Sequence, residues 1–242
     1  QITRTTTRLG AYVSNLPLLA LTMGDPAGVG PELGLMAAQS PEVRDVVRLM
    51  FIGTRRAYAR AAETLSVQLP WESDPERFSF DEIDDNLCDI PMGVVNAGAG
   101  AQSFEAVEQG IAMALDGAVD GLVTAPISKD AWHQSGVTFP GHTELLADRC
   151  GIVDFALMLV QDNWRVMHVS THVSLRDAID WVTRERIEQR LRLFDNILRE
   201  LGCAAPSIGV AGLNPHAGEG GLFGDEESRI IAPAIEAVRT DG

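Results

Sequence analysis

Short apolar runs alternate with amphipathic helical patterns along most of the chain, and this alternation restricts the fold more than any other feature of the sequence. The apolar runs predict strands at residues 18–23, 46–53, 93–96, 121–125, 155–160, 165–170 and 207–213. The helical patterns lie at residues 31–38, 55–65, 103–116, 183–201 and 225–238. Strands that alternate with helices predict an α/β fold with a mainly parallel sheet.

Three segments carry more local predictions. Ser103 is expected to N-cap the helix that follows it. Residues 71–89 are acidic, contain Pro75 and are poorly periodic, so we expect them to form an excursion on the surface. Residues 1–15 are rich in Thr and Arg and lack the apolar core of a signal peptide, so we expect a disordered leader that precedes the domain.

The composition argues against several classes of protein. With 45% hydrophobic and 22% charged residues among 242, the chain can bury a core and is not of the disordered type. A net charge of −15 argues against general binding of nucleic acids, whose phosphates the surface would repel. No apolar run reaches the length of about 18 residues that a membrane span needs. The cysteines, Cys88, Cys150 and Cys203, are odd in number and form no CxxC pair, which favours a reducing cytoplasm.

Polar and glycine-rich loops follow the predicted strands, where parallel α/β sheets place their ligands. Two of these loops carry His172 and His216, each just beyond an apolar strand. Neutral imidazole is the commonest metal ligand, so two histidines in equivalent positions suggest a metal site. Each could instead be a hydrogen-bonded structural residue. His168 lies four residues before His172 and could support that site or belong to the core.

Lys129 is the only lysine among the 19 Lys and Arg residues, and it follows Thr-Ala-Pro at a predicted strand end. A chain that otherwise uses arginine keeps lysine where it needs a compact ammonium group or an amine that can exchange a proton. The alternative is a chance lysine on the surface. We therefore take Lys129 as the candidate catalytic residue, for proton transfer or for anchoring an anionic group of the substrate.

A second candidate pair, His142 and Thr143, lies in the sequence Pro-Gly-His-Thr-Glu. An imidazole beside a hydroxyl can clamp a phosphate or hydroxyl group, and Gly141 would let the backbone turn tightly. Thr143 could also N-cap a helix over residues 144–149.

The loop at residues 24–30 follows a strand as well, but it lacks the GxGxxG and GxxxxGKS/T fingerprints of nucleotide-binding loops. No cofactor-binding residues are therefore assigned.

Five motifs together resemble the PdxA family of 4-hydroxythreonine-4-phosphate dehydrogenases. They lie in family order at residues 23–32 (MGDPAGVGPE), 124–129 (TAPISK), 140–144 (PGHTE), 170–172 (STH) and 213–219 (LNPHAGE). The resemblance runs from about Leu18 to the last residue.

The resemblance implies an isocitrate-dehydrogenase-like, two-lobed fold. It also implies NAD- or NADP-dependent oxidation, with decarboxylation, of a phosphorylated 3-hydroxy acid. It places two ligands of a divalent metal (Zn, Mg or Co) at His172 and His216, and the substrate contacts at His142 and Thr143. It further implies a homodimer in which the partner subunit completes the active site. The expected substrate is 4-phosphooxy-threonine, in pyridoxal phosphate biosynthesis.

The family's third metal ligand lies in a Tyr-His-Asp-Gln-Gly-like motif that this sequence does not contain. We therefore expect residues 16–242 to be one incomplete catalytic domain, with lobes at about 16–120 and 121–242 and with its C-terminal part missing. Other branches of the family act on 4-phospho-threonate or 4-phospho-erythronate, or on aromatic cis-dihydrodiols. Residues 221–227 resemble the phospho-threonate branch. A catalytically inactive metal- or anion-binding fragment is the remaining alternative.

Overall fold

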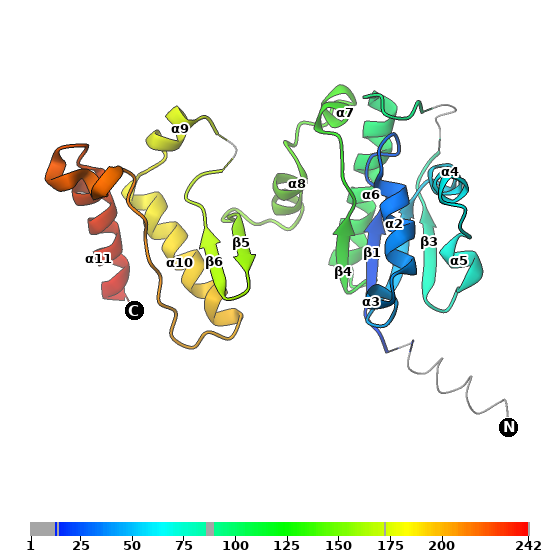
Figure 1. The fold of residues 1–242 in the computed structure, drawn as a ribbon, viewed down its shortest axis with the longest axis horizontal. Coiled ribbons are helices and arrows are strands. Elements are labelled where there is room, and N and C mark those ends of the chain that lie inside the picture. The colour runs from blue at the N-terminus through cyan, green and yellow to red at the C-terminus, as the bar shows by residue number, and fades with distance from the viewer. Residues whose placement is uncertain (1–12, 14, 86–89, 172, 242) are drawn as a thin grey trace. The chain divides into compact units, whose positions relative to one another are not determined.

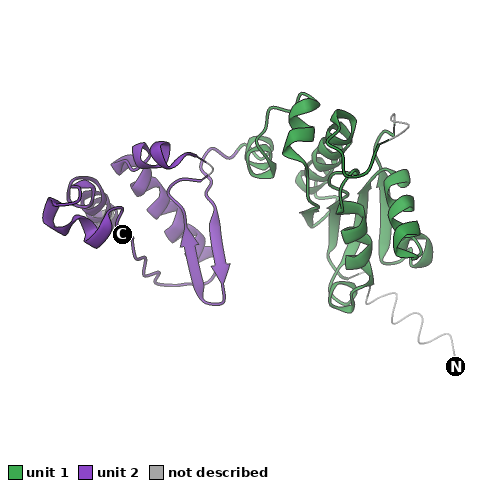
Figure 2. Ribbon diagram, turned by 45° about the horizontal axis from the view of Figure 1, so that its top comes forward, with its two compact units in different colours: residues 1–151 green, residues 152–242 purple. Residues whose placement is uncertain are grey.

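The computed structural model describes residues 13, 15–85, 90–171 and 173–241, and it divides into two compact units. Unit 1 comprises Gln1–Gly151 and unit 2 comprises Ile152–Gly242 (Figures 1 and 2). This division falls later than the lobe boundary expected near residue 120, because the strand Gly121–Thr124 pairs within the sheet of unit 1. Most of the expected leader lies outside the described residues.

Unit 1 is built on a four-stranded parallel sheet in the order β3-β2-β1-β4 (Figure 1). Its strands are β1 (Leu18–Thr22), β2 (Arg48–Gly53), β3 (Phe78–Glu82) and β4 (Gly121–Thr124). Its helices are α2 (Gly30–Gln39), α3 (Pro41–Arg44), α4 (Arg55–Leu65), α5 (Pro70–Ser73), α6 (Ala97–Leu115), α7 (Lys129–Gln134) and α8 (His142–Arg149). The predicted α/β class with a parallel sheet is confirmed.

Helices cover both faces of this sheet. Leu21 and Phe51 are partners across β1 and β2, and both side chains approach α2. The next pair in register, Thr22 and Ile52, approaches α6. Because successive residues of a strand point to opposite faces, α2 covers one face and α6 covers the other (Figure 1). The helix α4 packs beside α2.

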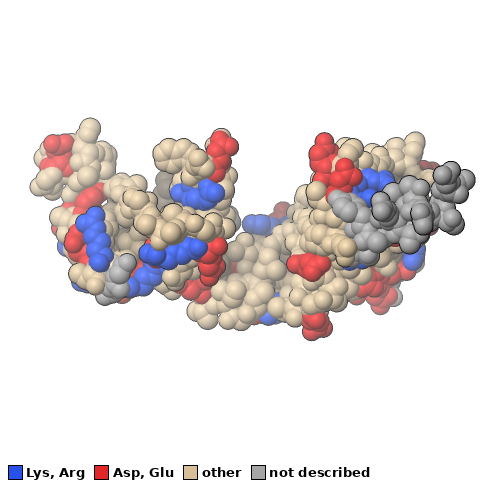
Figure 3. All heavy atoms as spheres, turned by 90° about the horizontal axis from the view of Figure 1, so that it is seen from below, with Lys and Arg blue, Asp and Glu red and all other residues tan. Residues whose placement is uncertain are grey.

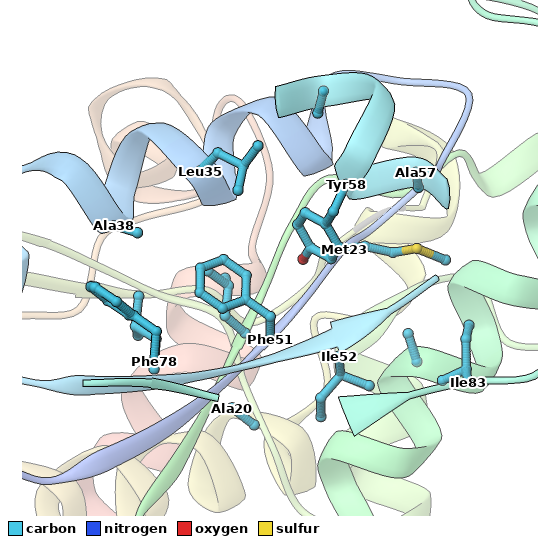
Figure 4. Close-up of a cluster of buried hydrophobic side chains, with 14 of the residues drawn as sticks. Ala20, Met23, Leu35, Ala38, Phe51, Ile52, Ala57, Tyr58, Phe78 and Ile83 are labelled. Carbon is cyan, nitrogen blue, oxygen red and sulfur yellow. The ribbon is translucent and has the colours of Figure 1, made fainter. Parts of the chain in front are cut away.

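A cluster of aromatic side chains packs between α4 and the sheet. Phe51 and Tyr58 are completely buried and their ring centroids lie 5.4 Å apart (Figure 4). The ring centroid of Trp71 lies 5.2 Å from that of Phe51, and the ring centroid of Phe78 lies 6.3 Å from that of Phe51. Aromatic pairs of this kind contribute roughly 0.5–1.5 kcal/mol each beyond the burial of their area. The cluster therefore fixes the distance between α4 and the sheet.

The expectation that residues 71–89 form a surface excursion is wrong. This segment contains β3, which pairs with β2 at the edge of the sheet. Phe78 and Phe80, two residues apart on β3, belong to the aromatic cluster. An edge strand needs apolar residues on one face only, so β3 has few of them. The acidic residues around them make the segment look like exposed surface in the sequence. Residues 86–89, with Cys88, lie outside the described residues.

The long helix α6 begins earlier than predicted. Its N-cap is Asn96, whose side-chain oxygen accepts a hydrogen bond at 3.0 Å from a backbone amide of the first turn. Ser103, the expected N-cap, is instead buried inside the helix. Residues 93–96, expected as a strand, are not assigned to one. Gly93 lies in a turn there with a φ of +70°, and its N–H donates to the Ala27 carbonyl at 2.8 Å, which connects this segment to the loop after β1.

Unit 2 contains an antiparallel hairpin, three helices and two irregular helical turns within its described residues. The strands β5 (Met158–Gln161) and β6 (Trp164–Met167) pair with each other, and they overlap the strands predicted at residues 155–160 and 165–170. The other elements are α9 (Leu175–Asp180), α10 (Arg184–Glu200), η1 (Pro215–Gly221), η2 (Glu227–Ile231) and α11 (Ala232–Asp241). Ile187, Ile231 and Ala234 form a small buried core.

The strand predicted at residues 207–213 is wrong for the structure as described. No strand is assigned there, and Val210 packs against the core of unit 2 instead. The apolar alternation of this segment is a local property, whereas a strand also needs a neighbour with which to form hydrogen bonds.

Charge is distributed over the surface of both units. On the face shown in Figure 3, Asp and Glu side chains are scattered rather than gathered in one patch, and the net charge is −15. Cys150 and Cys203 are free and exposed. Among the described residues, no helix combines the length and the apolar character required to cross a membrane.

Gly100 allows α6 and α7 to approach closely, because a Cβ at this position would lie 2.0 Å from the Ala131 carbonyl oxygen. We predict that Gly100→Ala lowers the free energy of unfolding by roughly 1–3 kcal/mol, as measured by urea denaturation. Gly110→Ala on the same helix is the control, because its closest contact would be the movable end of the Leu122 side chain. Equal stabilities of the two variants would contradict this packing.

Candidate active site

The loops that follow β1 and β4 lie against each other at the carboxyl end of the sheet. Asp25 donates its backbone N–H to the Pro126 carbonyl at 2.9 Å. Gly24 has a φ of +67°, and a Cβ there would lie 2.3 Å from the same oxygen, so only glycine fits. Because β1 and β4 are neighbours, the motifs at residues 23–32 and 124–129 meet at the edge where parallel α/β sheets bind ligands.

Asp25 is buried and shapes its own loop. Its Oδ1 accepts the Ala27 N–H at 2.8 Å, and its backbone carbonyl accepts the Gly28 N–H at 3.0 Å. The Arg60 guanidinium of α4 donates to the Pro26 carbonyl. The loop is therefore held by the carboxylate of one of its own residues, Asp25, and by a hydrogen bond from Arg60 of α4.

Lys129 lies against the start of α8. It is the first residue of α7, whose N-cap Ser128 accepts a hydrogen bond from the Ala131 N–H at 3.2 Å. Lys129 Nζ lies 3.8 Å from the position that a Cβ of Gly141 would occupy. The fold thus places Lys129 beside His142, the residue that follows Gly141.

His142 is half-buried against Trp132. Their ring centroids are 5.6 Å apart and the rings are inclined by 71°. Trp132 is itself buried, and its indole N–H donates to Ser103 Oγ at 3.2 Å. The Nε2 atom of His142 is buried and has no hydrogen-bond partner among the described residues. Buried polar atoms normally have a partner, so this nitrogen is available to a ligand.

The protonation of His142 follows from these surroundings. Burial, and secondly the charge of Lys129, hold the pKa of His142 below its ordinary value. The imidazole is therefore neutral at neutral pH, so one ring nitrogen donates and the other accepts a hydrogen bond. That state suits contact with a phosphate or hydroxyl oxygen.

Thr143 does not cap a helix. The helix α8 begins at His142, its N-cap is Gly141, and no side chain caps it. The alternative that Thr143 N-caps a helix over residues 144–149 is therefore wrong, and Thr143 is exposed next to His142. The tight turn expected at Gly141 is also wrong, because its φ of 174° is an extended conformation that any residue adopts.

The candidate metal ligands belong to unit 2. His172 lies outside the described residues. His216 is exposed at the start of η1, and an imidazole is a donor that suits a divalent ion. His168 follows β6, and its buried Nδ1 lacks a hydrogen-bond partner among the residues described. Those residues contain no group of three His, Cys, Asp or Glu side chains suited to hold a metal.

Sequence reasoning misses the residues that support these side chains. Trp132, Ser103 and Arg60 lie on three different helices, so their contacts depend on the fold. The one available signal is the apolar position of Trp132, three residues after Lys129.

Comparison with known proteins gives the family. Residues 45–242 match the family model described as pyridoxal phosphate biosynthetic protein PdxA. The chain belongs to the PdxA family. It is 40% identical over 243 residues to D-threonate 4-phosphate dehydrogenase of Bordetella bronchiseptica, covering 96% of this chain and 69% of that protein. It is 39% identical over 236 residues to 4-hydroxythreonine-4-phosphate dehydrogenase of Geobacter metallireducens, covering 93% and 70% respectively.

A solved structure agrees with this assignment. The crystal structure of 4-hydroxythreonine-4-phosphate dehydrogenase from Klebsiella pneumoniae matches with a TM-score of 0.80 and 37% identity, covering 94% of this chain and 72% of that one. The resemblance carried by the five motifs is thereby confirmed, and this PdxA-family chain is a dehydrogenase that acts on a phosphorylated hydroxy acid. The expectation of a truncated chain is not borne out by the comparisons, because they report only what share of each protein is matched.

The charge of Lys129 should be detectable in the titration of His142. We predict that Lys129→Gln raises the pKa of His142 towards its ordinary value of about 6.5, as followed by NMR of the ring Cε1 proton. Lys129→Arg keeps the positive charge and is the matched control, in which the pKa of His142 should stay low. An unchanged pKa in Lys129→Gln would show that the two side chains do not interact.

The same depressed pKa has a consequence for stability. The unfolded chain binds a proton at this histidine more readily than the folded chain does, so stability should fall as pH drops below about 6.5. Urea denaturation of the unaltered protein and of His142→Gln, on both sides of that pH, measures how much His142 contributes to the pH dependence of stability. If the two proteins differ in free energy of unfolding by the same amount at every pH, the pKa of His142 is not lowered by folding.

Proposed function

We propose that this PdxA-family dehydrogenase oxidises the C3 hydroxyl of a four-carbon 3-hydroxy acid phosphorylated at O4, and that the resulting keto acid loses CO₂. The observation that carries the proposal is the placement of Lys129 beside a half-buried His142 at the strand-end edge of the sheet. A cation next to a neutral imidazole suits a substrate that carries both anionic and hydroxyl groups.

Three side chains would bind and orient this substrate. The buried, unpartnered Nε2 of His142 would form a hydrogen bond with a phosphate or hydroxyl oxygen. The exposed hydroxyl of Thr143, the next residue, would make a second contact with the same group. The Lys129 ammonium would neutralise an anionic group or exchange the proton of the reacting hydroxyl.

Two groups would complete the chemistry. When bound, NAD or NADP would accept the hydride, and a divalent ion (Zn, Mg or Co) would stabilise the negative charge that develops on the substrate oxygen. His172 and His216 would hold that ion. The loop at residues 24–30 lacks a nucleotide-binding fingerprint, and its buried carboxylate is used within the loop, so no cofactor-binding residues are proposed.

The comparisons change the order of the candidate substrates. The Bordetella relative is named for D-threonate 4-phosphate, and residues 221–227 resemble that branch of the family. We therefore propose D-threonate 4-phosphate as the preferred substrate. The Geobacter relative, named for 4-hydroxythreonine 4-phosphate, keeps 4-phosphooxy-threonine, the substrate expected from the sequence, as the second candidate.

An assay with a panel of substrates tests this proposal. Reduction of NAD and of NADP is followed with D-threonate 4-phosphate, 4-phosphooxy-threonine and their unphosphorylated forms, each with Zn, Mg or Co and with a chelator. We expect the largest kcat/KM for D-threonate 4-phosphate and a loss of activity with the chelator. Turnover of neither phosphorylated acid would favour the alternative of a non-catalytic metal- or anion-binding protein.

Lys129→Arg separates proton exchange from simple charge. We predict that this substitution lowers kcat by roughly 10²-fold or more, because a guanidinium does not release its proton at neutral pH. Asp130→Asn, at the exposed next position of α7, is the control and should keep the activity. A near-normal kcat for Lys129→Arg would show that only positive charge matters at this position.

We also propose that the protein is a homodimer, as the resemblance implies, and that it is cytoplasmic, as the cysteine content suggests. The hairpin β5–β6 exposes Leu159 (55%), Val160 (55%) and Trp164 (76%), and exposed apolar groups of this size are typical of interaction surfaces. The free cysteines support a reducing compartment.

Light scattering tests the dimer. The unaltered protein should have the mass of a dimer, and Trp164→Asp should shift it towards a monomer. Leu175→Asp introduces the same charge at an exposed position of α9, outside the hairpin, and should leave the dimer intact. A monodisperse monomer for the unaltered protein would contradict the proposal.

A further inference from the structure

The loop that carries His216 has an unusual backbone. Six consecutive residues have positive φ angles: His216 (53°), Ala217 (53°), Gly218 (81°), Glu219 (44°), Gly220 (67°) and Gly221 (100°). Three of them carry side chains, for which this left-handed conformation costs roughly 1–2 kcal/mol per residue. Such a run persists only where surrounding contacts enforce it.

The carboxylate of Glu227 makes the contacts that hold the start of this loop. Its Oε1 accepts the backbone N–H of Asn214 at 2.7 Å, and its Oε2 accepts the side-chain N–H of Asn214 at 3.0 Å. Asn214 precedes Pro215 and His216 directly. One carboxylate therefore fixes both the backbone and the side chain of Asn214, two residues before the left-handed run begins at His216.

The same carboxylate also lies against the backbone on both sides of the loop. A Cβ added at Gly212 would lie 3.2 Å from Glu227 Oε1, and one added at Gly218 would lie 3.1 Å from Glu227 Oε2. Gly218 is buried in the middle of the left-handed run, and its carbonyl accepts the Phe223 N–H at 3.1 Å. Glu227 thus contacts the segment before His216 and the segment after it.

We propose that Glu227 is a positioning residue, which holds the left-handed loop closed and so sets the His216 imidazole in the orientation required of a metal ligand. The part that concerns metal rests on the proposed function. The part that concerns the loop rests on the contacts of Glu227 alone.

A carboxylate suits this role better than an amide would. Both oxygens accept hydrogen bonds at once, whereas glutamine has one acceptor and would turn its own NH₂ towards the donor of Asn214. The hydrogen bonds from Asn214 hold the pKa of Glu227 below its ordinary value, so the group stays ionised at neutral pH.

The neighbouring Glu226 provides a matched control. Its Oε2 accepts the side-chain N–H of Asn214 at 2.7 Å, but no hydrogen bond links it to the Asn214 backbone among the residues described. Glutamine at position 226 can still accept from that side chain. Glu226→Gln removes the same charge, one residue away, without removing the contacts that carry the proposal.

The first measurement needs no metal. Hydrogen exchange is followed at the amides of Asn214 and Phe223 in the unaltered protein, Glu227→Gln, Glu227→Asp and Glu226→Gln. Glu227→Gln should accelerate both amides by roughly tenfold, and Glu227→Asp, which keeps the charge on a shorter side chain, by less. Amides of the core residues Ile187 and Ala234 should be unchanged, which shows that unit 2 stays folded. Unchanged exchange at Asn214 and Phe223 in Glu227→Gln would overturn the proposal.

The second measurement uses Co²⁺, whose absorption spectrum reports its ligands. Glu227→Gln should weaken Co²⁺ binding by roughly 10–100-fold, yet give the spectrum of the unaltered protein at saturation, because the ligands themselves remain. Glu226→Gln should bind as the unaltered protein does. Faster exchange with unchanged Co²⁺ affinity would overturn the role towards metal. If the unaltered protein binds no Co²⁺, the proposed metal function fails, and the exchange experiment still decides whether Glu227 holds the loop.

Discussion

The hydrogen bond from the Asp25 amide to the Pro126 carbonyl joins the ends of two neighbouring parallel strands, and the candidate site of unit 1 depends on it. The strands β1 and β4 point the same way, so their loops leave the sheet at one edge. The absence of a side chain at Gly24 lets the two loops touch. The chain beyond Pro126 then begins α7, which carries Lys129 towards the start of α8 and buries Trp132 beneath His142.

The parts of the fold that follow from local patterns could be predicted from the sequence. The helix at residues 55–65 has the predicted bounds, because Thr54 caps it and its apolar positions repeat with helical spacing. The strand β3 could not be recognised, since its apolar residues face one side only and acidic residues surround them. The segment at residues 207–213 shows the converse, because strand-like alternation does not provide a pairing partner.

Some residues of the candidate site could likewise be predicted from the sequence, and others could not. Lys129 and His142 stand out in the sequence because they follow strand-end or glycine motifs, and the fold brings them together. The residues that pack beneath His142 could not be recognised from the sequence, because the hydrogen bond between Trp132 and Ser103 joins residues 29 positions apart. The same holds for Glu227, whose role appears only when the left-handed loop around His216 is seen. His172 lies outside the described residues, so its role as a metal ligand stays a prediction.

A double-mutant cycle on Lys129 and His142 tests the central claim most directly, namely that these two side chains act on one substrate in one site. The quantity is kcat/KM for D-threonate 4-phosphate, measured for the unaltered protein, Lys129→Gln, His142→Gln and the double variant. If the two residues share a bound group, the single losses should not add, and the coupling should exceed about 0.5 kcal/mol. Losses that add within about 0.3 kcal/mol would show that the two residues act independently and would contradict the site described above.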